Sequence, residues 1–569
     1  MTTNETHAGG GEGEVFEDVT CGPVLDGAGL DPSDEFPEPA HVGGGGVGGG
    51  VGGVIGGGRR AGGVDEQGRL RSGRLAGLSM WGAIGVLSWP ILTESILNSL
   101  VGLVDTTLAS QISEAATDAI GVASYFAWFI SLVAMALATG ATALVSRSVG
   151  KGRLGVANAA VGQTVLLAVF SGIVVGGLIG GLAEGIATIV GLSEAGAPEA
   201  REAFVGYMRI IAAGVPLSSV LFSGIACLRG AGDSIRPSWS MAAANVVNIV
   251  VSFIACGASL SVSELVDGEV VTRELVPSVL GEGNGIGIAG IALGTVAAHA
   301  VGALIIVLML VQGKGGVKLK RLWLGFHPIT MRRLARLGLP NFFESLGMWG
   351  GNFLVVMMVG WLAIGMRAEG LDDGVYGAHI WGIRIEAFSF LPGFAMGMAA
   401  ATLAGQYLGA GRADLATRAV GRCLLVAGTI MTLLGVAFIT AGEEIIGTFS
   451  TQPSHLTMVP PILAICGVVQ LPFAIVMVTR SALRGVGDVR VTLMITLFTT
   501  YCVRLPMAYA LSGVDIPIPE WAGNGVIENP FREEASLTGL WMGLCGELVV
   551  RGVIFGARFL QGGWRTKQV

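Results

Sequence analysis

Long apolar segments separated by short polar loops fill most of the chain. Between residues 83 and 557, windows of about 20 residues carry few or no charges, which is the length a helix needs to cross a bilayer. The pattern predicts an all-α integral membrane protein with twelve spans, over residues 83–108, 119–142, 157–182, 203–226, 238–258, 285–311, 338–363, 376–400, 420–440, 457–479, 491–512 and 536–557.

Basic and acidic residues alternate between successive loops. Arginine and lysine lie before the first span and after every even-numbered one, whereas glutamate and aspartate gather in the other loops. The positive-inside rule places the basic loops in the cytoplasm. We therefore expect a multi-pass protein of the cell inner membrane with both termini cytoplasmic.

The chain divides into five regions by composition. Residues 1–75 are rich in glycine and acidic residues and have too few large apolar side chains for a core, so they are predicted to form a disordered cytoplasmic tail. The rest is predicted to comprise an N-terminal six-helix lobe over 76–312, a basic cytoplasmic linker over 313–337, a C-terminal six-helix lobe over 338–560 and a tail over 561–569.

Three motifs occur twice, in the same order and 250 to 259 residues apart: WPILTES (89–95) and LPNFFES (339–345), VSRSVGKGR (145–153) and AGQYLGAGR (404–412), and CLRGAGD (227–233) and ALRGVGD (482–488). The repetition indicates two homologous halves. Because each half has an even number of spans, both insert in the same orientation, and sites in such folds lie between or within the halves near the membrane midplane. The repeated glycines and arginines are simply explained as tight turns and interface anchors.

Composition excludes several other classes of protein. Hydrophobic residues make up 52% of the chain and charged residues 13%, and the net charge of −7 reflects acids and bases that lie in separate loops. The seven cysteines are scattered, so no metal site, disulfide framework or cofactor is expected. Neither a nucleic-acid partner nor an ATP-binding loop is indicated.

These motifs and their order resemble the multidrug and toxic compound extrusion (MATE) family. The resemblance rests on VDT (104–106), ATGATALVSRSVGKGR (138–153), LRGAGD (228–233) and HIWGIRIEAFSFLPGFAMGMAAATLAGQYLGAGR (379–412) and extends from about residue 80 to 560. It implies two six-helix lobes arranged as a V around a central cavity. It also implies export of amphipathic, often cationic, compounds in exchange for H⁺ or Na⁺.

Polar residues inside the first and fifth spans are the first candidate site. Glu94, Asn98 and Asp105 fall on one face of the first span, with about 16 Å between the two acids, and Asn245, Asn248 and Ser252 form a stripe on the fifth that is predicted to face Asp105. An acid inside a membrane is costly and usually serves a function. Hydrogen bonding between helices is the alternative for the asparagines and for Asp105.

The resemblance assigns ion coupling to Asp105, where a bound Na⁺ is the one metal it allows. Many prokaryotic members have an aspartate four residues after the asparagine that corresponds to Asn248. This chain has Ser252 there, so a mechanism that needs two carboxylates at this position does not carry over.

The second half has its own set of polar residues, Glu344, His379, Arg384 and Glu386. Glu344 is predicted to be a second ion or substrate site, or else to form a structural ion pair with Arg384, which would also be available to Glu386. His379 is either a titrating group or a packing residue. Glu547 and Arg551 are four residues apart and are predicted to pair along the last helix.

The sequence therefore predicts a secondary active exporter that is not an enzyme and acts as a monomer on small amphipathic molecules. A flippase for lipid-linked saccharide or cell-envelope precursors is the alternative, because relatives in the same superfamily share the fold. A membrane-embedded enzyme is disfavoured, since the intramembrane acids lack the spacing of a catalytic or metal-binding set.

Overall fold

The computed structural model describes residues 63–567 except 113, 190–197, 267–268, 282–283, 369–373, 451, 519–524 and 532–533. Over this part of the chain, eleven helices are long and apolar enough to cross a membrane, and a bent helix pair brings the total to twelve spans. The predicted helical membrane class is thus confirmed. Residues 1–62, most of the predicted tail, lie outside the described residues.

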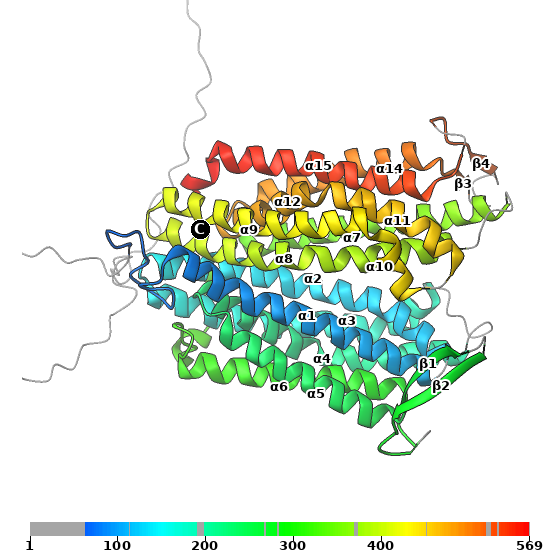
Figure 1. Ribbon diagram of the computed structural model, residues 1–569. Helices are drawn as coiled ribbons and strands as arrows, with labels where there is room; N and C mark the ends of the chain where they lie inside the picture. The colour runs from blue at the N-terminus through cyan, green and yellow to red at the C-terminus, as the bar shows by residue number, and fades with distance from the viewer. Residues whose placement is uncertain are drawn as a thin grey trace, which may run out of the picture. The chain divides into compact units, whose positions relative to one another are not determined.

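The helices follow the two predicted halves (Figure 1). The first half contains α1 (Met80–Ile112), α2 (Glu114–Gly150), α3 (Leu154–Ile189), α4 (Pro198–Gly230), α5 (Ile235–Cys256) and α6 (Ile288–Gln312). The second half contains α7 (Pro328–Ala368), α8 (Val375–Gly409), α9 (Ala413–Thr440), α10 (Gly442–Phe449), α11 (Pro453–Val468), α12 (Gln470–Gly485), α13 (Val489–Phe498), α14 (Leu505–Ser512) and α15 (Leu537–Gln561).

Two spans of the second half are irregular. The tenth consists of α11 and α12, which meet at 56°. Pro472 has no N–H to donate to the carbonyl of Val468, four residues earlier, so the helix breaks just before it. In the eleventh span, a π-helical turn, Thr499–Arg504, joins α13 to α14.

Two small hairpins add strands that the sequence did not predict. The first pairs β1 (Leu260–Val266) with β2 (Glu269–Val276), and the second pairs β3 (Ile516–Ile518) with β4 (Gly525–Ile527). Both are antiparallel and lie at the same end of the bundle (Figure 1). They occupy the acidic loops before the last helix of each half.

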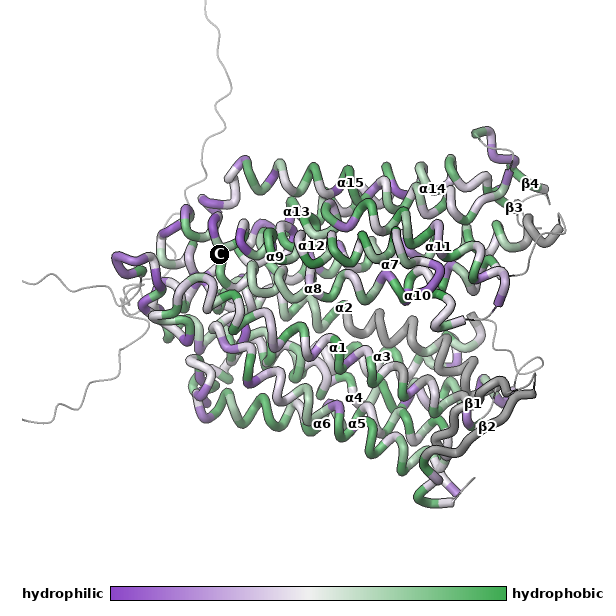
Figure 2. Tube along the Cα trace, in the orientation of Figure 1, coloured by the Kyte–Doolittle hydropathy of each residue, from purple (hydrophilic) through white to green (hydrophobic). Residues whose placement is uncertain are grey.

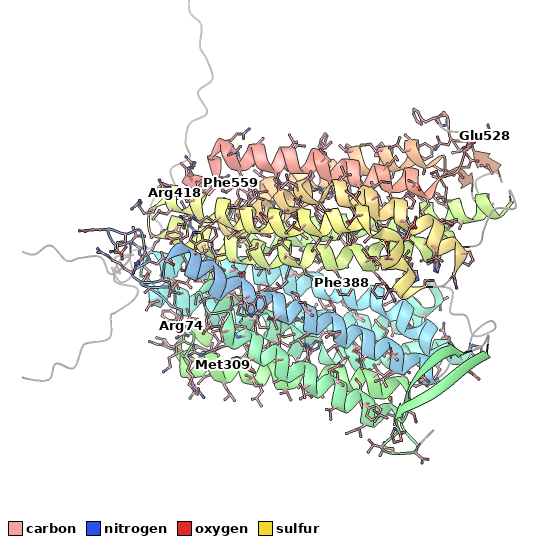
Figure 3. The ribbon with its side chains drawn as sticks, in the orientation of Figure 1. Arg74, Met309, Phe388, Arg418, Glu528 and Phe559 are labelled. Atoms are coloured by element: carbon pink, nitrogen blue, oxygen red, sulfur yellow. The ribbon has the colours of Figure 1, made fainter. Side chains whose placement is uncertain are left out.

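The opposite end of the bundle, here called the basic end, carries the loops rich in arginine and lysine. Figure 3 labels Arg74 and Arg418 at this end and Glu528 at the other, and Figure 2 shows hydrophilic segments at both ends with apolar helices between them. The alternation of charge along the sequence therefore corresponds to two ends of one bundle.

Residues 63–75 have a defined fold at the basic end, although the sequence assigned them to the tail. Val64 and Leu70 form a β-bridge, Leu70 and Leu75 are buried in the core of the second half, and Ser72 Oγ donates a hydrogen bond to the Val149 carbonyl at 2.6 Å. These two leucines are large apolar side chains, a kind of residue in which the glycine-rich sequence before them is poor.

The repeated motifs bring the two halves together at the basic end. Gly150 of α2 lies against the backbone of Gln406 in α8, and Gly409 of α8 lies against the backbone of Arg147 in α2, so a Cβ at either glycine would overlap the opposite helix. Gln406 Nε2 donates to the Gly230 carbonyl at 3.0 Å. Gly150 and Gly409 therefore allow the two helices to approach closely. The neighbouring Gly152 and Gly411, with φ of 74° and 78°, make the turns.

We expect Gly150→Val and Gly409→Val each to separate the halves at the basic end. Thr402, which is buried there, is replaced by cysteine in a cysteine-free background, and its reaction with a maleimide is expected to accelerate at least several-fold in both variants. Gly421→Val is the control, because the space around Gly421 is open. Equal rates in all three proteins would show that the glycines do not hold the halves together.

Candidate functional site

Asp105 lies on α1 within the first half and is half-buried. The Asn248 amide and the Ser252 hydroxyl of α5 approach its carboxyl group. Oδ1 is buried and accepts no hydrogen bond within the described part of the chain. The structure thus brings the polar stripe of the fifth span to Asp105, as the sequence predicted, and leaves a carboxylate oxygen without a donor.

A polar layer continues from Asp105 across α1, α5 and α6. Asn245 Nδ2 donates to Asn98 Oδ1 at 2.9 Å, and Asn248 Nδ2 donates to Thr295 Oγ1 at 3.2 Å. Ser252 Oγ donates to the Ile291 carbonyl at 3.4 Å. The asparagines therefore do link helices, and at the same time they position polar atoms around Asp105.

A cavity of about 150 Å³ lies in the first half between α2, α4 and α6. Its polar lining comes from Tyr207, Ser218, Thr295 and His299. Tyr207 also interacts electrostatically with Asp105. The sequence analysis missed these residues, although Thr295 and His299, four apart on the sixth span, fall on one helix face.

Glu94 lies apart from Asp105 and is paired with arginine. Arg229 Nη2 of the LRGAGD motif lies 2.5 Å from Glu94 Oε2, and Ser238 Oγ donates to the same oxygen at 3.1 Å. All three side chains come from different helices of the first half. Glu94 is therefore already paired with a positive charge in this conformation.

Glu344 has the equivalent partner in the second half. Arg484, at the motif position of Arg229, lies 2.9 Å from Glu344 Oε1, and Arg480 lies 2.6 Å from the same oxygen. Thr492 and Thr496 donate to this carboxylate at 3.1 and 2.7 Å. The predicted pairing of Glu344 with Arg384 is not formed. Arg384 instead is exposed on α8 and lies 6.0 Å from the ring centre of Trp381.

The other candidates of the second half are dispersed. His379 is buried against Trp541, with ring centres 5.5 Å apart, so its surroundings are those of a packing residue. Glu386 lies on the same helix and interacts electrostatically with Arg504. Glu547 and Arg551 form the predicted pair at 2.5 Å, and Arg504 joins it at 3.2 Å.

A protein-family model matches two segments of the chain, one in each half. The model, described as MatE, matches residues 90–254 and 340–510. The chain belongs to the MatE family. The two matched segments contain the predicted site residues, from Glu94 to Ser252 and from Glu344 to Glu386, and they confirm the duplication.

Relatives of this MatE protein are similar over most of its length. A probable multidrug resistance protein NorM of Thermotoga maritima is 23% identical over 85% of this chain and 93% of its own. The multidrug resistance protein PmpM of Pseudomonas aeruginosa is 24% identical over 80% of this chain and 86% of its own.

The fold is also that of solved transporters. A structure described as an outward-facing conformation of a multidrug resistance MATE family transporter of the MOP superfamily aligns with a TM-score of 0.70 at 19% identity, covering 86% of this chain and 97% of that one. A structure of MATE in the straight conformation aligns with a TM-score of 0.71 at 20% identity and the same coverage.

We expect Glu94→Gln to destabilise this MatE protein by about 3 to 5 kcal/mol, because it leaves Arg229 buried without its counter-charge. Denaturant unfolding of the protein in micelles measures the loss. In the double variant with Arg229→Gln, the loss is expected to be smaller than the sum of the single losses. Arg209→Gln is the control, because Arg209 and its partner Glu184 are 57% and 63% exposed. Strictly additive losses would show that Glu94 and Arg229 are not coupled.

Proposed function

We propose that this MatE protein is a secondary active multidrug efflux transporter of the cell membrane. It exports amphipathic compounds, including cations, by antiport with H⁺ or Na⁺ through alternating access of its two halves. The names of the relatives support the efflux activity. The contact of the halves at the basic end supports a cycle in which this end closes and opens.

The observation that carries the coupling mechanism is the isolation of Asp105. Glu94, Glu344 and Glu547 each lie within 3.2 Å of an arginine, whereas no ion pair to Asp105 occurs among the described residues. An acid inside a membrane without a fixed cation is stabilised by binding a proton or a metal cation. Glu386 also forms no ion pair among the described residues, but it interacts electrostatically with Arg504. Asp105 has no such arginine in the part of the chain that the structure describes, so it is the acid whose charge can change during transport.

Each step of the cycle then follows from competition for one carboxylate. A cation or proton that enters beside Asn248 and Ser252 neutralises Asp105, and the negative charge that returns on its release favours entry of a cationic compound. Ser252 contributes a hydroxyl and no second charge, so one unit of charge is exchanged at this position. The cavity lined by Tyr207 and Thr295 gives this region space for water.

A lipid-linked precursor flippase is a second candidate function, favoured by a single observation. In the second half, four arginines outnumber the acids that they contact, and phosphate groups are recognised by arginine. The isolated acid in the first half favours the exporter, since a flippase for an anionic lipid has no evident use for it.

We expect Asp105→Asn to reduce export of ethidium from drug-sensitive cells to the level of cells without the transporter, because the amide cannot exchange a charge. The measurement follows the decrease of ethidium fluorescence in cells that express the wild type, Asp105→Asn or Glu184→Gln at equal levels. Repeating it with a protonophore, or without Na⁺, identifies the ion. Glu184→Gln is the control, since it removes an exposed acid of the same half. Normal export by Asp105→Asn would contradict the coupling role. Failure of the wild type to export several cationic dyes would favour the flippase.

A further inference from the structure

The second half contains two clusters in which arginines outnumber acids. Arg480 and Arg484 share the single carboxylate of Glu344, at 2.6 and 2.9 Å. Arg504 and Arg551 share the single carboxylate of Glu547, at 3.2 and 2.5 Å. Each guanidinium carries one positive charge at any physiological pH, so each cluster retains one that its carboxylate does not cancel.

One further acid faces these clusters. Glu386 of α8 interacts electrostatically with Arg504 but forms no ion pair or hydrogen bond through its side chain in the described part of the chain. Even with Glu386 ionised, the four arginines exceed the three acids. Among the remaining titratable groups, His379 packs on Trp541 and Arg384 is exposed on the same helix, and neither supplies a negative charge.

Arg480 and Arg504 are the two arginines within reach of a ligand. Their side chains are 14% and 13% exposed, whereas that of Arg551 is 2% exposed. The side chain of Arg484 is also 14% exposed, but its Nε and Nη2 are both directed at Glu344 and its Nη2 is buried. Arg504 Nη1 donates to Oδ1 of Asn352 at 2.8 Å, and Asn352 itself is exposed. These residues lie inside apolar spans, where charged and amide groups are not left facing lipid, so their open side faces a space that admits water.

The hydrogen-bonding capacity of the exposed pair is also incompletely used. Nη2 of Arg480 contacts the sulfur of Met348 at 2.9 Å, and a thioether is a weak acceptor. Arg551 is held by Thr499, Thr500 and Glu547, and it interacts electrostatically with both Arg480 and Arg504. The guanidiniums of Arg480 and Arg504, which are partly exposed, therefore form the edge of a positively charged region whose inner part is fixed.

We propose that the surface formed by Arg480, Arg504 and Asn352 binds the carboxylate, sulfonate or phosphate group of an amphipathic compound. The site extends the proposed export function, on which its role in transport rests, to compounds that carry a negative charge. Arginine suits this ligand because its planar donors match the paired oxygens of these groups. The asparagine amide offers a further donor beside them.

The probe for this site is dansylate, 5-(dimethylamino)naphthalene-1-sulfonate, an amphipathic anion. Its fluorescence anisotropy is measured with the full-length protein in phosphatidylcholine nanodiscs, and the signal of empty discs is subtracted. We expect saturable binding to the wild type and an affinity at least about tenfold lower for Arg504→Gln, which loses a charge-assisted hydrogen bond. Glu386→Gln is expected to bind more tightly, because it removes the acid beside Arg504. Arg412→Gln is the control, since Arg412 is 43% exposed and paired with Asp414.

The opposite signs of the two variants distinguish a binding site from a structural role, which would weaken binding in both. Arg480→Gln is the second test, and it leaves Glu344 one arginine, so folding is expected to be retained. Absence of saturable binding by the wild type, or equal affinity in Arg504→Gln and Glu386→Gln, would overturn the proposal. Addition of phosphatidylglycerol to the discs identifies the source of the group: competition shows that a lipid phosphate can occupy the site, and lack of competition assigns it to the soluble compound.

The proposal and the exporter function fail separately. If ethidium export is absent but dansylate binding responds to the variants as expected, the anion site is supported and the exporter function is rejected. If ethidium export depends on Asp105 but Arg504→Gln and Glu386→Gln leave the affinity for dansylate unchanged, the exporter function is supported and the anion site is rejected.

Discussion

A charge inside a membrane must be cancelled by a partner or solvated by water. This constraint explains where the motifs that occur in both halves lie in the structure. In each half, a glutamate on the first helix meets an arginine of the LRG motif, Glu94 with Arg229 and Glu344 with Arg484. The carbonyl of Arg229 also accepts a hydrogen bond from Thr402 of the other half at 3.2 Å. Cancellation of charge within a half and contact between halves thus depend on the same turn.

The two halves have diverged from this common plan in opposite directions. The first half adds Asp105, an acid to which no ion pair forms within the described residues, and surrounds it with hydroxyl and amide groups. The second half adds Arg480, Arg504 and Arg551 and, beside them, the two acids Glu547 and Glu386. The duplication supplied two equivalent scaffolds, and the added charges give one a negative and the other a positive character.

Hydropathy was sufficient to predict the spans, because a helix that crosses a bilayer needs about 20 predominantly apolar residues. The position of residues along a helix likewise predicted which of them share a face, as Asn245 and Asn248 do. Partners across helices were harder to predict, since they depend on how helices pack. Arg480 lies one residue beyond the predicted tenth span and was overlooked, whereas the structure continues α12 through it to Gly485. Arg384 lies within a predicted span and was therefore given a partner that it does not contact.

The π-helical turn at Thr499–Arg504 makes the position of Arg504 depend on the number of residues before it. A π turn holds one residue more than the α-helical turn that it replaces. Without that residue, the following part of the helix would rotate by about 100° and carry Arg504 away from Glu547. An alignment of this span with a relative that lacks the turn therefore needs a gap inside a membrane helix, where gaps are usually forbidden, and an alignment without it would match the arginine to a residue on a different face.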